Sequence, residues 1–149
     1  MIDAPAKLTL SLRVTGVRED GFHLIDAEMV TLDLVDKVCI TPNEDGLNFE
    51  GPFSSGISTD SSNLVRRALS LAGRSARVHI EKNIPSGGGL GGGSADAAAI
   101  LNWAGFTDLE AASRLGADIP FCMIGGRARV RGIGELIETL PPVQRKITL

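Results

Sequence analysis

The sequence has 149 residues and a formal net charge of −3 at neutral pH. This length is enough for one domain with its own hydrophobic core. The acidic balance argues against nucleic acid or an anionic membrane as partners. No apolar run approaches the roughly 18 residues of a membrane span, and no secretory leader pattern opens the sequence. The two cysteines, Cys39 and Cys122, lie in apolar stretches without metal-ligand spacing. We therefore expect buried thiols in a cytoplasmic protein.

Alternating apolar and polar residues open the chain. From Ala6 to Val14 the apolar residues fall on every second position, which predicts a strand with one apolar face. Turn residues then precede a second extended stretch, at about Phe22 to Leu34, and a third over Lys37 to Thr41. This pattern indicates an antiparallel meander. Between Pro42 and Ser62 turn-forming residues dominate, so we expect a surface loop or a weak hairpin there.

Helical patterns dominate the middle of the chain. The remaining predicted elements are a helix from about Ser62 to Ala72 stopped by Gly73, a strand over Ala76–Glu81, helices over about Ser94–Trp103 and Asp108–Leu115 with Gly116 as stop, and short strands over about Arg127–Arg131 and Glu135–Thr139. Because strands cluster early and helices later, we predict an α+β fold, with a mostly antiparallel sheet packed on helices.

A glycine-rich segment, PSGGGLGGGS over residues 85–94, separates a predicted strand from a predicted helix. Glycines let backbone amides approach an anion, and a helix N-terminus adds free N–H donors and a partial positive charge. Ser94 is placed to cap that helix or to donate to the same anion. The segment lacks the Lys-Ser or Lys-Thr of a Walker loop, and no Rossmann unit surrounds it. We predict a phosphate-binding loop rather than a flexible linker, formed by Pro85, Gly87, Gly88, Gly89, Leu90, Gly91, Gly92, Gly93 and Ser94.

Several motifs together carry a family resemblance. Residues 85–98 resemble the nucleotide-binding signature of the GHMP kinases, the superfamily of galactose, homoserine, mevalonate and phosphomevalonate kinases. The flanking motifs are Pro5–Leu8, Arg18–His23, Asn63–Val65 and Leu115–Pro120. Their order and rough spacing resemble the branch that phosphorylates diphosphocytidyl-methylerythritol on the non-mevalonate route to isoprenoids. The resemblance runs from about Ala4 to about Pro142. It implies that residues 1–149 are the family's N-terminal ATP-binding domain, without its C-terminal domain.

Two residues are candidates for catalysis. From the residues alone, Lys7 is a solvated lysine on the polar face of the first strand, and Asp118 is as well placed to cap a short helix as to act in catalysis. The resemblance implies that Asp118 is the general base that accepts the proton of the attacking hydroxyl. It also implies that Lys7 offsets the charge that grows on the transferred phosphoryl group.

Other positions are expected to contact the two substrates. The resemblance implies that Phe22 stacks on cytosine and that His23 hydrogen-bonds to it; without it, this pair is an exposed turn. The family usually has tyrosine at the position of Phe22, and Thr9 stands where it commonly has a substrate-contacting asparagine.

Asn63 and Lys82 match positions near the adenine and ribose of ATP, although alone they would be a helix cap and an exposed lysine. Asp96 could stabilise the helix start or take part in binding Mg²⁺.

The resemblance thus predicts a kinase that uses ATP and Mg²⁺ and acts on a small molecule bearing cytidine diphosphate, with no dedicated protein ligand identified for the metal. The family's enzymes are longer than this chain, and the segment from Ile100 to Leu115 is shorter here. We therefore expect that the isolated chain folds but does not turn over, and that a patch near residues 147–149 favours a homodimer or a complementing domain. The alternatives are another GHMP small-alcohol kinase and a non-catalytic nucleotide-binding domain.

Overall fold

The structure, a computed structural model, describes residues 1–143. The elements in chain order are β1 (Ile2–Val17), β2 (His23–Pro42), β3 (Gly46–Glu50), α1 (Leu64–Leu71), β4 (Ala76–Glu81), α2 (Gly92–Trp103), α3 (Leu109–Leu115), α4 (Ile119–Ile124), β5 (Arg127–Gly132) and β6 (Leu136–Thr139). The patch expected near residues 147–149 lies outside the described residues.

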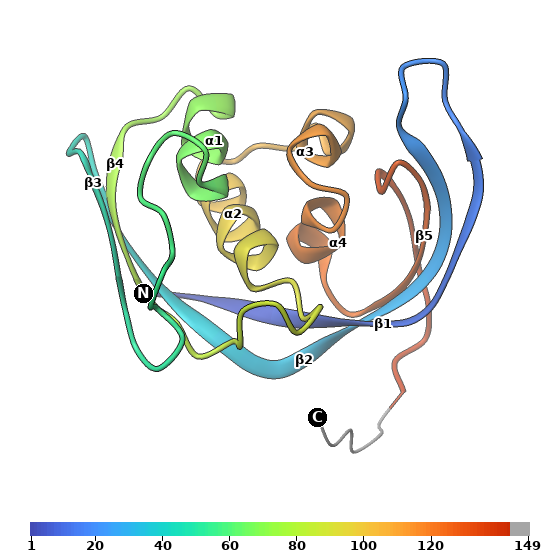
Figure 1. Cartoon of the computed structure of the whole chain (residues 1–149), viewed down its shortest axis with the longest axis horizontal. Coiled ribbons are helices and arrows are strands. Elements are labelled where there is room, and N and C mark those ends of the chain that lie inside the picture. Colours follow the sequence, from blue (N-terminus) through green and yellow to red (C-terminus); the bar gives the residue numbers. More distant parts are fainter. Residues whose placement is uncertain (144–149) are drawn as a thin grey trace.

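Strand β2 organises the sheet. One of its edges pairs antiparallel with β1, and the other pairs antiparallel with β5 near its start and with β4 near its end. The strand order is β3-β4-β2-β5-β6, with β1 attached to β2. The sheet is strongly curved, and all four helices lie on its inner side (Figure 1). The predicted α+β class is confirmed, but β3 runs parallel to β4, so the meander prediction was incomplete.

Three element boundaries differ from the sequence prediction. The second and third predicted strands are one continuous strand, β2, because the charged residue between them, Asp36, is buried in the sheet with its charge paired. The segment expected to be a loop contains β3. Helix α2 begins at Gly92, and its N-cap is Gly91 in a left-handed conformation, so the prediction of Ser94 as cap was wrong.

Register shifts change which side of β1 faces the helices. The pairing of β1 with β2 is irregular between Pro5 and Lys7, between Thr9 and Ser11, and again after Val14. Each irregularity moves the following side chains relative to strict alternation. Ala6 is therefore fully buried, whereas Leu12 and Val14 are 60% and 56% exposed. The prediction of one continuous apolar face on this strand was wrong.

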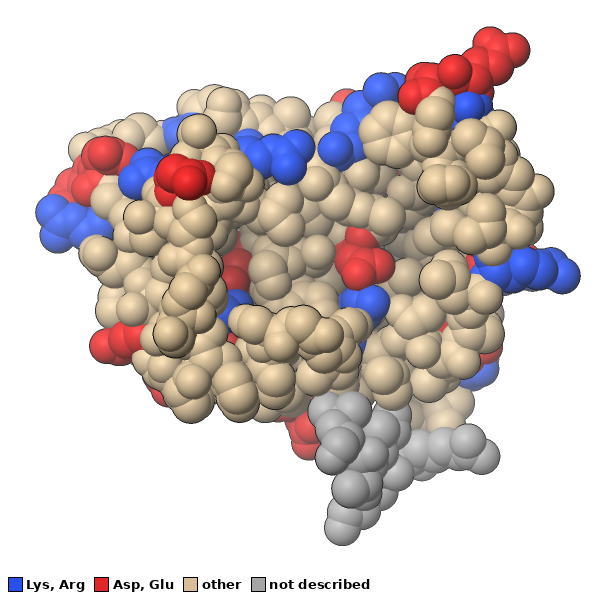
Figure 2. Space-filling view, viewed as in Figure 1, with Lys and Arg blue, Asp and Glu red and all other residues tan. Residues whose placement is uncertain are grey.

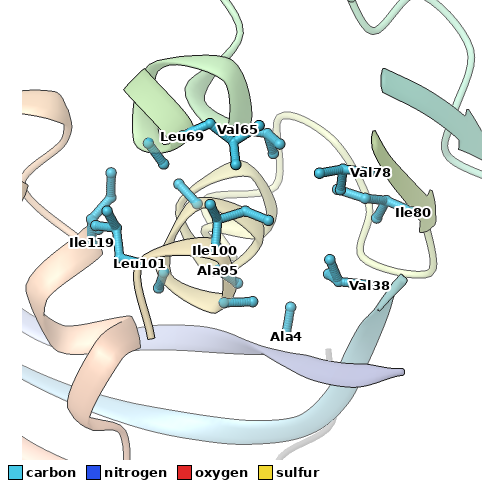
Figure 3. Close-up of a cluster of buried hydrophobic side chains, with 14 of the residues drawn as sticks. Ala4, Val38, Val65, Leu69, Val78, Ile80, Ala95, Ile100, Leu101 and Ile119 are labelled. Carbon is cyan, nitrogen blue, oxygen red and sulfur yellow. The ribbon is translucent and has the colours of Figure 1, made fainter. Parts of the chain in front are cut away.

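Helix α2 lies at the centre of the core. It is apolar around most of its circumference, as expected for a helix that is covered on all sides. Ile100 and Leu101 are fully buried. Figure 3 shows that Ile100 and Leu101 lie among side chains from α1, α4 and the sheet. The labelled neighbours are Ala4, Val38, Val65, Leu69, Val78, Ile80 and Ile119. This packing fixes the position of the N-terminus of α2.

Two further expectations concern single residues and the membrane. Cys39 and Cys122 are free thiols that are only half-buried, so the expectation of buried cysteines was wrong in degree. Burial nevertheless raises the pKa of Cys122 to about 12. Within residues 1–143, no helix is both long and apolar enough to cross a membrane.

Candidate functional site

The glycine-rich loop lines a pocket of about 390 Å³. Its wall combines the loop, the first turn of α2 and side chains from both sides of the loop. Of the residues predicted to bind ATP, all except Gly88 line this pocket. Gly87 and Gly89 have left-handed φ values of +78° and +70°, and a Cβ at either position would point into open space. The loop therefore presents backbone rather than side chains to the pocket.

The pocket opens onto the N-terminus of α2. No side chain caps this helix, and Gly91 in the left-handed conformation makes the turn into it. The first backbone bond of the helix runs from the Ala95 N–H to the Gly91 carbonyl, at 2.8 Å. The preceding N–H groups, at positions 92–94, point out of the helix start, where the helix dipole favours an anion. The pocket thus has the donors that a phosphate group requires.

Lys7 and Asp118 form an ion pair, although 110 residues lie between them in the sequence. The distance from Lys7 Nζ to Asp118 Oδ2 is 3.0 Å. Lys7 is buried in β1, and the Asp118 side chain is 30% exposed. Lys7 Nζ also donates to Thr9 Oγ1 at 3.0 Å. Asp118 precedes α4 but makes no capping hydrogen bond, so its carboxylate is held by Lys7 rather than by the helix. Figure 2 shows acidic and basic atoms side by side in the hollow of this face, away from the charged rim.

The ion pair adjoins the glycine loop without lining its pocket. The Lys7 N–H donates to the Leu90 carbonyl at 2.9 Å, which joins β1 directly to the loop. A Cβ at Gly91 would lie 2.9 Å from Lys7 Cγ, so only glycine leaves room for the lysine stem. Gly91 therefore serves both the turn into α2 and the placement of Lys7.

Lys82 is not the exposed residue that its sequence context suggested. It is 3% exposed and pairs with the carboxylates of Asp36 and Asp96, the latter at 2.6 Å. Asp36 also accepts the N–H groups of Asn83 and Ile84, at 2.6 Å and 2.9 Å. Burial, opposed by the charge of Lys82, raises the pKa of Asp96 to about 7. Lys82 and Asp96 line the pocket, so its inner wall carries this buried ion cluster.

The other predicted site residues lie at two places. Asn63 caps α1 by accepting the Val65 N–H at 2.9 Å, and it also lines the pocket. Phe22 and His23 lie at the turn between β1 and β2, and in Figure 1 this turn stands to the side of α3. The Arg114 guanidinium of α3 lies 5.9 Å from the centre of the Phe22 ring. The structure therefore places Phe22 on a different part of the surface from the pocket lining.

A protein-only metal site is not evident in the described part of the chain. Residues 1–143 contain no group of three or more histidine, cysteine, aspartate or glutamate side chains arranged to hold a metal ion. Asp36 and Asp96 meet at the Lys82 ammonium, which occupies the position between them. Asp96 Oδ1 has no hydrogen-bond partner within residues 1–143.

Residues 62–126, which contain α1, the loop, α2 and Asp118, match the family model described as "GHMP kinases N terminal domain". By this match the chain is similar to the GHMP kinases over part of their N-terminal domain. Similarity to known proteins extends beyond this match. A protein of Paracoccus denitrificans named 4-diphosphocytidyl-2-C-methyl-D-erythritol kinase is 49% identical over 93% of this chain and 50% of its own length. A Clostridium kluyveri protein of the same name is 40% identical over 99% of this chain and 58% of its own length.

The GHMP kinase fold is also found among solved structures. A crystal structure titled 4-(cytidine 5'-diphospho)-2C-methyl-D-erythritol kinase matches with a TM-score of 0.69 and 38% identity, covering 93% of this chain and 54% of that one. The mevalonate kinase of Methanococcus jannaschii shares the fold, with a TM-score of 0.56 and 13% identity, over 94% of this chain and 55% of its own. This chain spans about half the length of the curated relatives that it matches.

Sequence reasoning missed two contributors to the site. Asp36 was not singled out, although it is the one carboxylate in the mostly apolar stretch LVDKVCI, and a carboxylate in such a stretch is a signal of a paired charge. The role of Gly91 beside Lys7 left no such signal, because the contact joins segments that are far apart in the sequence.

Proposed function

We propose that this chain is the ATP-binding half of a kinase that transfers the γ-phosphoryl group of ATP to a hydroxyl of 4-diphosphocytidyl-2-C-methyl-D-erythritol. The observation that carries the proposal is the Lys7–Asp118 pair directly beside a loop of backbone donors. The names of the relatives at 40–49% identity support the choice of substrate.

Each part of the site has a task in this reaction. The loop and the start of α2 hold the phosphates of ATP through backbone N–H groups. Asp118 takes the proton of the hydroxyl as its oxygen bonds to the γ-phosphorus, while the bond to ADP breaks. Lys7 offsets the negative charge on the transferred group. ATP brings Mg²⁺ on its own phosphates, because this ion is commonly held by substrate phosphates and one or two carboxylates.

The hairpin turn supplies the recognition of the second substrate. The ring of Phe22 offers a stacking surface for cytosine, and His23 beside it is exposed and free to hydrogen-bond. The Arg114 guanidinium near this ring adds a cation close to where a diphosphate would extend.

Nucleotide binding can be tested on the chain as it is. A non-hydrolysable ATP analogue with Mg²⁺ should shift the amide resonances of Gly88 to Ser94 and leave those of β6 unchanged. Shifts confined to regions away from the loop would contradict the assignment of the pocket.

Substrate choice requires the rest of the enzyme. The chain can be fused to the C-terminal half of the Paracoccus denitrificans relative, and ADP release followed with the cytidylylated substrate, with homoserine and with mevalonate. We expect release only with the cytidylylated substrate. Release with homoserine or mevalonate instead would assign the domain to another GHMP kinase, and release with none of the three would favour a non-catalytic domain.

A further inference from the structure

The buried cluster of Lys82, Asp36 and Asp96 has no part in the chemistry proposed above. Its side chains come from three segments: Asp36 from the middle of β2, Lys82 from the residue after β4, and Asp96 from the fifth position of α2. All three residues are at most 3% exposed. Burying three ionisable groups is unfavourable unless they pair with one another. The presence of such a cluster beside the pocket therefore needs a structural explanation.

The cluster touches both ends of the glycine loop. At the upstream end, Asp36 Oδ1 accepts the N–H groups of Asn83 and Ile84, the two residues before Pro85. At the downstream end, Asp96 lies one helical turn after Gly92, where α2 begins. The Lys82 ammonium joins the two carboxylates through Asp36 Oδ2 and Asp96 Oδ2.

We propose that Lys82 and Asp96 are positioning residues, which hold the two ends of the glycine loop at a fixed separation and so keep its backbone donors in place for a phosphate group. A loop with several glycines has a large conformational entropy that opposes any single arrangement. Fixing both ends lowers that entropy before the ligand arrives, which is how preorganisation raises affinity. The affinity part of this proposal rests on the phosphate-binding function proposed above, whereas the positioning part does not.

Removing Asp96 should change the affinity for Mg-ATP in opposite directions, depending on whether Asp96 acts through its charge or through the position of the loop. Above pH 7, where Asp96 is ionised, the cluster carries one net negative charge beside a pocket for an anion. Through charge alone, Asp96→Ala should strengthen the binding of Mg-ATP. Through loss of positioning it should weaken binding, because Lys82 would then be tied only to Asp36. In the alanine variant the Lys82 ammonium keeps the Asp36 carboxylate as its partner, so the variant is expected to fold.

The experiment compares the wild-type chain with Asp96→Ala, Asp96→Asn and Asp3→Ala. Asparagine keeps an acceptor for Lys82 without the charge. Asp3 pairs with Lys37 at 2.7 Å on the exposed surface, so its removal changes the net charge equally at another place. The measurements are hydrogen exchange of the ligand-free chain and calorimetric titration with a Mg²⁺-bound ATP analogue. Asp96→Ser serves as a second variant that cannot reach Lys82, should the alanine variant fail to fold.

We expect Asp96→Ala to speed exchange about tenfold at the amides of Lys7 and Ala95, which donate to the Leu90 and Gly91 carbonyls. The amides of Asn83 and Ile84, held by Asp36, should keep their protection. Affinity for the nucleotide should fall about tenfold in Asp96→Ala and change less than about threefold in Asp96→Asn and Asp3→Ala.

Other outcomes overturn the proposal. Unchanged exchange at Lys7 and Ala95, equal loss of protection at all four amides, or tighter nucleotide binding by Asp96→Ala would each show that the cluster does not position the loop. If the wild-type chain binds no nucleotide while the selective loss of protection is observed, the positioning role stands and the proposed function fails instead.

Discussion

At the scale of single residues, Asp118 offers the most direct test of the chemistry. In the fusion with a C-terminal half, Asp118→Asn should lower turnover by about 10²-fold or more, the scale expected for loss of a general base, with little change in ATP affinity. Steady-state ADP release and analogue titration measure the two quantities.

Asp108 provides the matched control for this prediction. It also precedes a helix, but its side chain does cap that helix by accepting the Ala111 N–H at 2.9 Å. Asp108→Asn should therefore leave turnover unchanged. Equal turnover in the Asp118→Asn variant and the wild type would reduce Asp118 to a structural residue.

Alanine substitutions at Gly91 and Gly87 distinguish the stability cost of backbone strain from that of a steric clash. Both have φ values in the left-handed region, +71° and +78°, so alanine at either position costs about 1 kcal/mol of folding free energy. Only at Gly91 would the new methyl group collide with Lys7. Gly91→Ala should therefore destabilise the chain by an additional 1 kcal/mol or more. Urea unfolding of both variants tests this. Equal losses of stability would show that the Lys7 side chain moves aside without cost.

At the scale of elements, Asp96 in helix α2 makes the free energy of unfolding depend on pH. The pKa of Asp96 is about 7 in the folded chain and 3.8 as the ordinary value. Between these values the folded chain keeps a proton that the unfolded chain has released, so the stability gained from protonated Asp96 is lost as pH rises toward 7. We expect the free energy of unfolding to fall by about 1 kcal/mol per pH unit between pH 5 and 7 and to level off above.

Asp96→Asn isolates this effect, because asparagine stays neutral at every pH. Its free energy of unfolding should vary much less over the same interval. The pKa values of Asp26 and Asp60 are lowered to about 2, so these groups change the free energy of unfolding only at lower pH. A wild-type chain whose stability rises from pH 5 to 7 would contradict the protonated state of buried Asp96.

Local sequence signals predicted most elements but not their pairing. Helices α1, α2 and α3 and strand β4 were found because caps, stops and periodic apolar residues are local properties. The bulges of β1 and the parallel pairing of β3 with β4 depend on contacts between distant segments, which no short window contains. The same distinction applies to the site. The loop was found from its own residues, whereas the roles suggested for Lys7 and Asp118 required the family resemblance, and the buried partners of Lys82 required the fold.

At the scale of the whole molecule, we expect the isolated chain to fold without turning over. A continuous core surrounds α2, so folding needs no further domain. Phosphoryl transfer, however, depends on holding the acceptor in line with the γ-phosphate, a contribution of about 7–11 kcal/mol to the barrier. Incubating the chain with Mg-ATP and the cytidylylated substrate should give no ADP above a no-substrate control. Substrate-dependent release would show that one domain, or two copies of it, completes the site.

The Lys7–Asp118 contact also sets the time at which the site can exist during biosynthesis. Strands β1 and β2 form a hairpin between neighbouring segments, so they can pair as soon as both have left the ribosome. Asp118 emerges only after β4, α1 and α2. Lys7 must therefore wait for its partner until these elements have been synthesised, already fixed in a hairpin. Two ribosome-bound chains can be compared, one arrested with residue 118 still inside the ribosome and a longer one in which it has emerged. Both should contain the hairpin, but only the longer should protect the Lys7 side chain from amine-modifying reagents.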